Sequence, residues 1–123
     1  MGEFSILVVD DEEDFVNTLV HRLRKRGWAS EGVLTGGAAI TRVAAGDFPV
    51  ILLDMRLPDM DGGQVLQEIK KIRPASRVLI LTGHASASEG EEGLKNGAFD
   101  YLLKPVEFET LLEKLEAAKD CGP

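Results

Sequence analysis

Four apolar runs of the sequence each end in side chains that could take part in chemistry, and these side chains are Asp10 with Asp11, Asp54, Thr82 and Lys104. A short apolar run followed by acidic residues, Gly or Pro is typical of a buried strand that ends where the polarity changes. The carboxyl ends of parallel strands meet at one edge of a sheet, where ligands bind in open α/β folds. We therefore expect side chains that lie far apart in the sequence to become neighbours at this edge.

The chemistry of this predicted cluster follows from its charges. Carboxylates close together repel one another, and a like pair about 4 Å apart costs about 4 kcal/mol at an effective dielectric constant of about 20. A hard divalent cation relieves this repulsion, and a site with few protein oxygen ligands and several waters suits Mg²⁺. The amine of Lys104 can pair with an oxyanion, and the hydroxyl of Thr82 can donate a hydrogen bond. Together these groups favour phosphoryl transfer onto Asp54.

The elements that would position these side chains alternate between strand and helix. Strands are predicted over residues 5–9, 28–33, 50–54, 77–81 and 98–103. Apolar residues at helical spacing predict helices over residues 15–25, 36–46, 64–72, 86–96 and 108–119. Five strands alternating with five helices indicate an α/β fold around a parallel sheet, and the strand at 28–33 is polar enough to lie at an edge.

Length and composition narrow the class of protein. The 123 residues suffice for one hydrophobic core, so we expect a single domain over 1–123 with its core at about 5–118 and a short tail after it. The net charge of −7 argues against nucleic-acid binding, which needs a basic surface. The apolar runs are too short to cross a membrane and no signal-peptide pattern is evident, so no membrane contact is expected. The single cysteine, Cys121, favours a reducing compartment, and we expect a cytoplasmic location.

Four motifs together resemble the receiver domain of response regulators in two-component signalling. They are VVDD at residues 8–11, LDMRLPDMDG at 53–62, LTG at 81–83 and GAFDYLLKP at 97–105. Each motif alone is weak, but all four occur in order and each stands at a predicted strand end. The resemblance covers nearly the whole chain. It implies a flavodoxin-like, doubly wound, five-stranded parallel sheet in the order 2-1-3-4-5, with five helices.

The resemblance also implies a phosphoacceptor site. Asp54 would take a phosphoryl group from the phosphohistidine of a sensor histidine kinase or a phosphotransfer protein. Mg²⁺ would be held by Asp11, Asp54 and the backbone carbonyl of Arg56, with Asp10 acting mostly through water. Self-phosphorylation and self-dephosphorylation would be the only reactions, so we do not expect an enzyme that turns over external substrates.

A conformational switch is implied as well. Lys104 would pair with a phosphoryl oxygen, and its peptide bond to Pro105 would be cis. Thr82 would move toward the phosphoryl group and Tyr101 would rotate inward behind it. This would reshape the face formed by the fourth helix, fifth strand and fifth helix, which would act on a partner, on an attached output domain, or in a phosphorylation-dependent homodimer.

Two glycines lie in the predicted fourth helix, Gly90 and Gly93. Each costs about 1 kcal/mol relative to alanine in a helix interior. We infer from the sequence that this helix is marginally stable and is the element that phosphorylation resets.

The lifetime of the phosphoryl group is expected to depend on Arg56 and His84, because the resemblance places both side chains near it. A guanidinium at Arg56 could pair with phosphoryl oxygens and obstruct an attacking water. The sequence therefore predicts slow self-dephosphorylation.

Other classes of protein share some of these features. Phosphatases with an aspartate nucleophile carry an Asp-x-Asp motif, in which the second acid serves as proton donor. Here that position is Arg56, which cannot serve as such a donor. No P-loop is present, and Arg56 and Pro58 break the EF-hand pattern that would start at Asp54. A flavodoxin would need a phosphate-binding loop after the first strand, where the acidic residues would repel phosphate. A degenerate receiver that only binds proteins is the remaining alternative, although the acids, Thr82 and Lys104 are all present.

Overall fold

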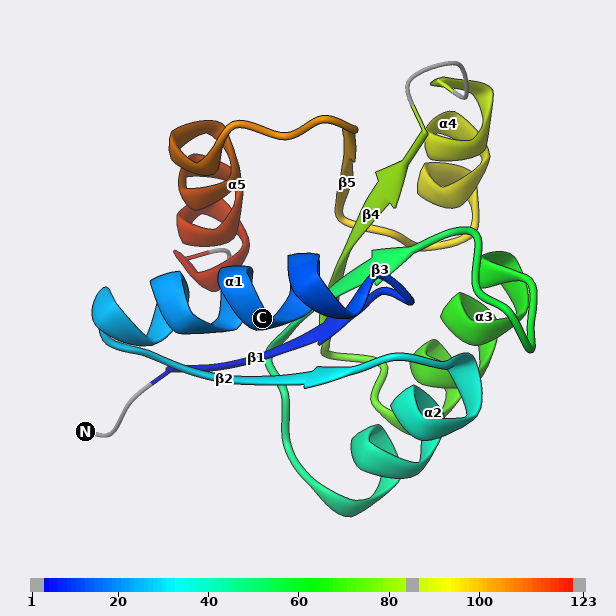
Figure 1. Cartoon of the computed structure of the whole chain (residues 1–123). Coiled ribbons are helices and arrows are strands. Elements are labelled where there is room, and N and C mark those ends of the chain that lie inside the picture. Colours follow the sequence, from blue (N-terminus) through cyan, green and yellow to red (C-terminus); the bar gives the residue numbers. More distant parts are fainter. Residues whose placement is uncertain (1–3, 84–86, 121–123) are drawn as a thin grey trace.

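A parallel five-stranded sheet in the order β2-β1-β3-β4-β5 forms the centre of the computed structural model, which describes residues 4–83 and 87–120 (Figure 1). The strands are β1 (Phe4–Val9), β2 (Trp28–Val33), β3 (Val50–Asp54), β4 (Arg77–Thr82) and β5 (Asp100–Leu103). The helices are α1 (Glu13–Lys25), α2 (Gly36–Ala45), α3 (Gly62–Ile72), α4 (Ala87–Lys95) and α5 (Phe108–Asp120). The predicted fold class, strand order and five helices are confirmed, and β2 lies at an edge of the sheet as expected.

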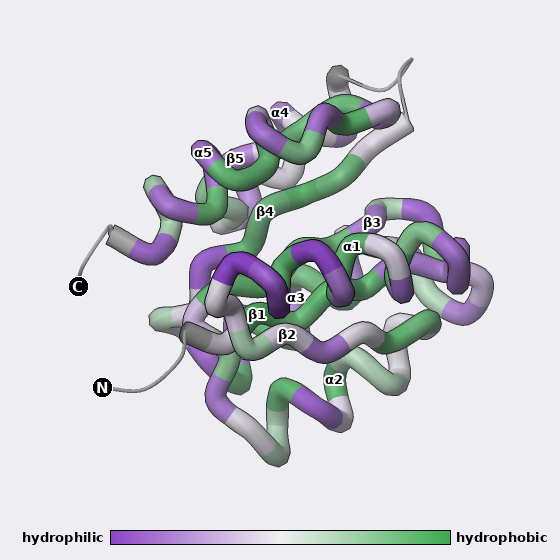
Figure 2. Tube along the Cα trace, turned by 60° about the vertical axis from the view of Figure 1, so that its left-hand side comes forward, coloured by the Kyte–Doolittle hydropathy of each residue, from purple (hydrophilic) through white to green (hydrophobic). Residues whose placement is uncertain are grey.

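Helices cover both faces of the sheet, which explains why its central strands are apolar without alternation. All five residues of β3 are buried, and successive residues point to opposite faces. Val50 and Leu52 pack with α1 and α5, whereas Ile51 and Leu53 pack with α2 and α3. In Figure 2, β4 is hydrophobic over most of its length, whereas the helices around it carry both hydrophobic and hydrophilic residues. Within the described residues, no helix combines the length and apolar character needed to cross a membrane.

The loop between β3 and α3 is held in place by two aspartates. The Asp59 carboxylate accepts hydrogen bonds from the backbone N–H groups of Gly36 (2.8 Å) and Gly37 (2.9 Å) at the start of α2. Asp61 caps α3 by accepting from the N–H of Gly63 at 2.6 Å. This cap starts α3 two residues earlier than the apolar periodicity indicates. The loop that follows Asp54 is therefore anchored to two helices.

The start of β5 differs from the sequence prediction. The strand begins at Asp100, not at Ala98. Gly97 adopts a φ of +107°, and the N–H of Ala98 donates to the carbonyl of Gly93 at 2.9 Å. Ala98 therefore closes α4 instead of opening the strand, although its apolar side chain resembles those of the strand.

Candidate functional site

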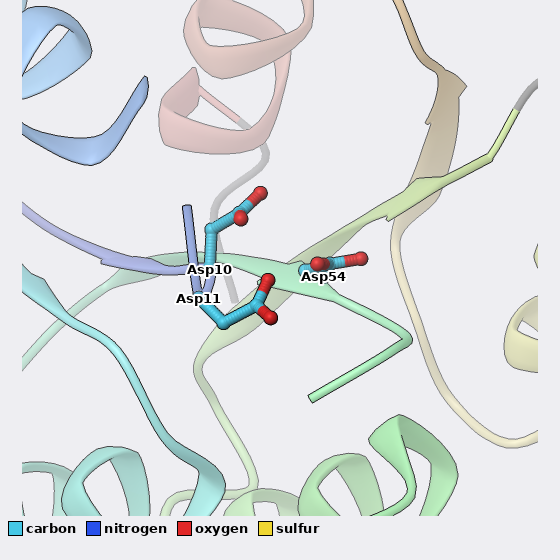
Figure 3. Close-up of side chains that lie close together, drawn as sticks. All are labelled: Asp10, Asp11 and Asp54. Atoms are coloured by element: carbon cyan, nitrogen blue, oxygen red, sulfur yellow. The ribbon is translucent and has the colours of Figure 1, made fainter. Parts of the chain in front are cut away.

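Three carboxylates meet at the carboxyl edge of the sheet. Asp10 and Asp11 follow β1, and Asp54 ends the neighbouring β3, which pairs with β1 in parallel. One carboxylate oxygen from each residue lies within 4.8 Å of the others, and Figure 3 shows the three side chains converging. Asp10 and Asp54 are buried, whereas Asp11 is exposed. The structure thus brings together the acidic residues that the sequence analysis selected.

The amine of Lys104 reaches the same cluster from the end of β5. Its Nζ lies 2.7 Å from Oδ2 of Asp10 and 3.6 Å from Oδ2 of Asp54. It also lies 3.2 Å from Oε1 of Glu12 and 5.2 Å from the ring centroid of Phe15. The sequence analysis did not identify this ion pair with Glu12. The single ammonium therefore faces several carboxylates.

Burial and charge change the acid–base properties of this cluster. Burial raises the pKa of Asp54, and the carboxylates of Asp10 and Asp11 add to the rise. The N–H of Arg56 and the ammonium of Lys104 oppose it without cancelling it. Burial acts to lower the pKa of Lys104, but its hydrogen bond to Asp10 and the nearby negative charges raise that pKa overall. The amine therefore stays charged, and the carboxylates carry negative charge that it only partly balances.

The donor set fits a hard divalent cation. Carboxylate oxygens are the ligands that Mg²⁺ prefers, at about 2.0–2.1 Å from the ion, so two ligands of one ion lie no more than about 4.2 Å apart. The oxygens of Asp10, Asp11 and Asp54 lie within 4.8 Å of one another, which a small rotation or a bridging water would accommodate. One oxygen of Asp54, Oδ1, accepts from the N–H of Arg56 at 3.2 Å. The three acids, with the Arg56 backbone beside them, could hold Mg²⁺.

Thr82 and Tyr101 lie on the strands next to this cluster. Thr82 ends β4 beside β3 and is fully buried, and its hydroxyl donates to the carbonyl of Gly83 at 3.2 Å. Tyr101 lies on β5, pairs in register with Ile80 and is partly buried under α4. The peptide bond between Lys104 and Pro105 is cis.

The side chain of Arg56 reaches α4. Its Nε lies 3.7 Å from Oε2 of Glu89, and the Arg56 side chain is 73% exposed. The other oxygen of Glu89, Oε1, is buried and has no hydrogen-bond partner in the part of the chain that the structure describes. Sequence reasoning did not identify Glu89. His84, which was predicted to influence the phosphoryl lifetime, lies outside the described residues, so its role stays a prediction.

Known proteins resemble this chain in both sequence and fold. The response regulator receiver domain family matches residues 6–116. The transcriptional regulatory protein ZraR of Salmonella typhimurium is 40% identical over 117 residues, which are 95% of this chain and 26% of that protein. A crystal structure of a CheY-like response regulator receiver domain protein from Methanospirillum hungatei has a TM-score of 0.92 and 32% identity, over 97% of this chain and 95% of that chain.

A second structural relative carries a modified aspartate. It is a response regulator protein from Burkholderia pseudomallei, whose crystal structure contains a phosphorylated aspartic acid, a calcium ion and citrate. Its TM-score is 0.83 and its identity 30%, over 96% of this chain and 74% of that chain. This chain thus spans nearly the whole of one solved receiver domain but about a quarter of the length of ZraR.

Proposed function

This chain belongs to the response regulator receiver domain family, and on that premise we propose that Asp54 is its phosphoacceptor in two-component signalling. The observation that carries the proposal is the convergence of Asp10, Asp11, Asp54 and Lys104 at one edge of the sheet. Asp54 is the member of this group that ends the central β3 strand. The phosphorylated aspartic acid in the Burkholderia pseudomallei relative supports the same chemistry here.

The reaction follows from the two oxygens of Asp54. Oδ1 accepts the N–H of Arg56, whereas Oδ2 faces the Lys104 ammonium, so Oδ2 is the proposed nucleophile. It attacks the phosphorus of a phosphohistidine, an O–P bond forms, the N–P bond breaks, and the imidazole leaves with the electron pair. Lys104 then pairs with a phosphoryl oxygen while Asp10 keeps its amine in place. Mg²⁺ held by the three acids and the Arg56 carbonyl would supply positive charge that offsets the phosphoryl oxygens.

The signal would pass from this edge to the surface through Thr82 and Tyr101. The Thr82 hydroxyl, now bonded to the carbonyl of Gly83, would turn to a phosphoryl oxygen. Tyr101 would then rotate inward and change the face formed by α4, β5 and α5. In a longer protein this face would act on an output domain. The name of the relative ZraR, a transcriptional regulatory protein, supports control of transcription as that output.

The partners follow from the direction of transfer. A sensor histidine kinase or a phosphotransfer protein would donate the phosphoryl group, and phosphorylation could also join two copies of the chain through the changed face. The acidic net charge of −7 makes nucleic acid an unsuitable partner for this domain.

Acetyl phosphate with Mg²⁺, followed by intact mass spectrometry, tests the proposal. The wild type should gain the mass of one phosphoryl group, and Asp54→Asn should gain none. Asp47→Asn is a matched control, because Asp47 is exposed and lies before the amino end of β3, whereas Asp54 lies at its carboxyl end. Phosphoramidate should also serve as a donor, since its P–N bond resembles that of phosphohistidine. Equal labelling of the wild type and Asp54→Asn would refute the assignment.

A further inference from the structure

Two buried glycines of α4 face the sheet, and they meet different neighbours. A Cβ atom built on Gly90 would lie within 3.0 Å of three ring atoms of Tyr101, namely Cγ, Cδ1 and Cδ2. A Cβ atom built on Gly93 would approach one atom within 3.0 Å, Cδ1 of Ile80, and the next atom, Cγ1, is 3.6 Å away. Real Cβ atoms essentially never approach other atoms within 3.0 Å, so a side chain at either position forces a shift.

The two shifts differ in kind. The Cδ1 atom of Ile80 is the end of a flexible side chain and can turn aside by rotation about one bond. The ring of Tyr101 is rigid, and three of its atoms stand in the way, so the whole ring must leave or α4 must lift from β5. The absence of a side chain at residue 90 is therefore a requirement of the ring position.

We propose that Gly90, because it has no side chain, forms a seat for the Tyr101 ring and thereby sets how closely the ring packs against α4. Gly90 acts as a positioning residue, and the link between the ring position and switching rests on the proposed function. The Tyr101 ring occupies this seat in the structure. A methyl group at residue 90 occupies the same space as the ring, so it displaces the ring from the seat.

The residue beside the seat is tied to the phosphoacceptor loop. Glu89 precedes Gly90 and pairs through Oε2 with Nε of Arg56 at 3.7 Å. The N–H of Arg56 in turn donates to Asp54. A phosphoryl group on Asp54 competes with Glu89 for the Arg56 guanidinium, which loosens α4 next to the seat. These contacts connect Asp54 with Tyr101 through residues of this chain.

Fluorine NMR of the protein labelled with 3-fluorotyrosine tests the seat directly, because Tyr101 is the only tyrosine. In the unphosphorylated protein, Gly90→Ala should move the resonance. Gly93→Ala is the matched control, since it makes the same change in the same helix, and it should leave the resonance in place. Equal shifts in both variants, or no shift in Gly90→Ala, would overturn the seat.

A double-mutant cycle keeps the test decisive if Gly90→Ala folds poorly. In the Tyr101→Ala background no ring meets the new methyl group, so Gly90→Ala should raise the folding equilibrium constant by up to about fivefold through helix propensity. In the wild-type background the same change should lower it. The same effect in both backgrounds would overturn the seat.

Acetyl phosphate with Mg²⁺ then separates the two proposals. Phosphorylation should move the resonance of the wild type, because switching changes the position of the ring in the seat. If intact mass shows phosphorylation while the resonance stays in place, the seat has no part in switching and the inference fails. If no phosphoryl group is gained, the proposed function fails, whereas the two arms on unphosphorylated protein still decide whether the seat exists.

Discussion

Replacing Asp11 by asparagine should stabilise the protein in the absence of Mg²⁺ and should make it less stable than the wild type in saturating Mg²⁺. Without the ion, Asp11 contributes repulsion to the cluster, because its carboxylate lies within 4.8 Å of those of Asp10 and Asp54. With the ion, the same carboxylate becomes a ligand. Whether this substitution stabilises or destabilises the protein therefore depends on Mg²⁺.

The size of the effect follows from distance and exposure. Two like charges 4.8 Å apart cost about 3.5 kcal/mol at an effective dielectric constant of about 20 and about 0.9 kcal/mol in bulk water. Asp11 is exposed, and Lys104 offsets the charge of Asp10 at 2.7 Å, so one pair near the lower figure remains. We expect a gain of about 1 kcal/mol for Asp11→Asn, or roughly 4 °C in Tm. Mg²⁺ at about 100 times its Kd adds about 2.7 kcal/mol to the free energy of unfolding of the wild type. The wild type then becomes more stable than Asp11→Asn.

Thermal unfolding in EDTA and across a Mg²⁺ titration measures the stability difference between Asp11→Asn and the wild type without and with the ion. Asp14→Asn is the matched control, since it removes the same charge from the first turn of α1 outside the carboxylate cluster. It should lose about 0.3–1 kcal/mol from the helix dipole, with or without Mg²⁺. The reasoning is refuted if Asp11→Asn is no more stable than the wild type in EDTA, or if Mg²⁺ leaves their order unchanged.

Two further predictions concern ion pairs. Arg56→Ala should shorten the acyl phosphate half-life about three- to fivefold, and Glu89→Gln should lengthen it, because Glu89 competes for the Arg56 guanidinium. The loss of the phosphoryl group from Asp54 over time measures both half-lives. An unchanged half-life in Arg56→Ala would exclude a role of the Arg56 side chain in protecting the acyl phosphate. The hydrogen bond from Arg42 lowers the pKa of Glu31 from its ordinary value of 4.5, so the pair stabilises the fold above that pH, and the contribution is lost as the pH falls through the lowered pKa. Chemical denaturation should therefore show Glu31→Gln less stable than the wild type at pH 7 and equal to it at pH 2, whereas a constant difference would contradict the assignment.

The fold and the acidic cluster could be predicted because their signals are local in the sequence. An apolar run that ends in Asp54 or in Asp10 indicates both a buried strand and the edge at which it stops. Parallel pairing then places these strand ends together whatever their separation along the chain. The contacts of Lys104 with Asp10 and Asp54 follow from the same rule.

The remaining features depend on packing in three dimensions. The contacts of Glu12 with Lys104 and of Glu89 with Arg56 join long side chains across elements, and no spacing in the sequence indicates them. The low helix propensity of Gly90 suggested a marginal helix, which stays a prediction, whereas its close contact with the Tyr101 ring appears only when α4 lies against β5.

Reduction of the acyl phosphate with borohydride, followed by peptide sequencing in a mass spectrometer, tests the central claim most directly. The reagent converts a phosphorylated aspartate to homoserine and leaves an unmodified carboxylate unchanged. After treatment with acetyl phosphate and Mg²⁺, we expect homoserine at residue 54 alone, and none when EDTA replaces Mg²⁺. Homoserine at Asp10 or Asp11, or equal conversion of Asp54 without Mg²⁺, would contradict a metal-dependent phosphoacceptor at the end of β3.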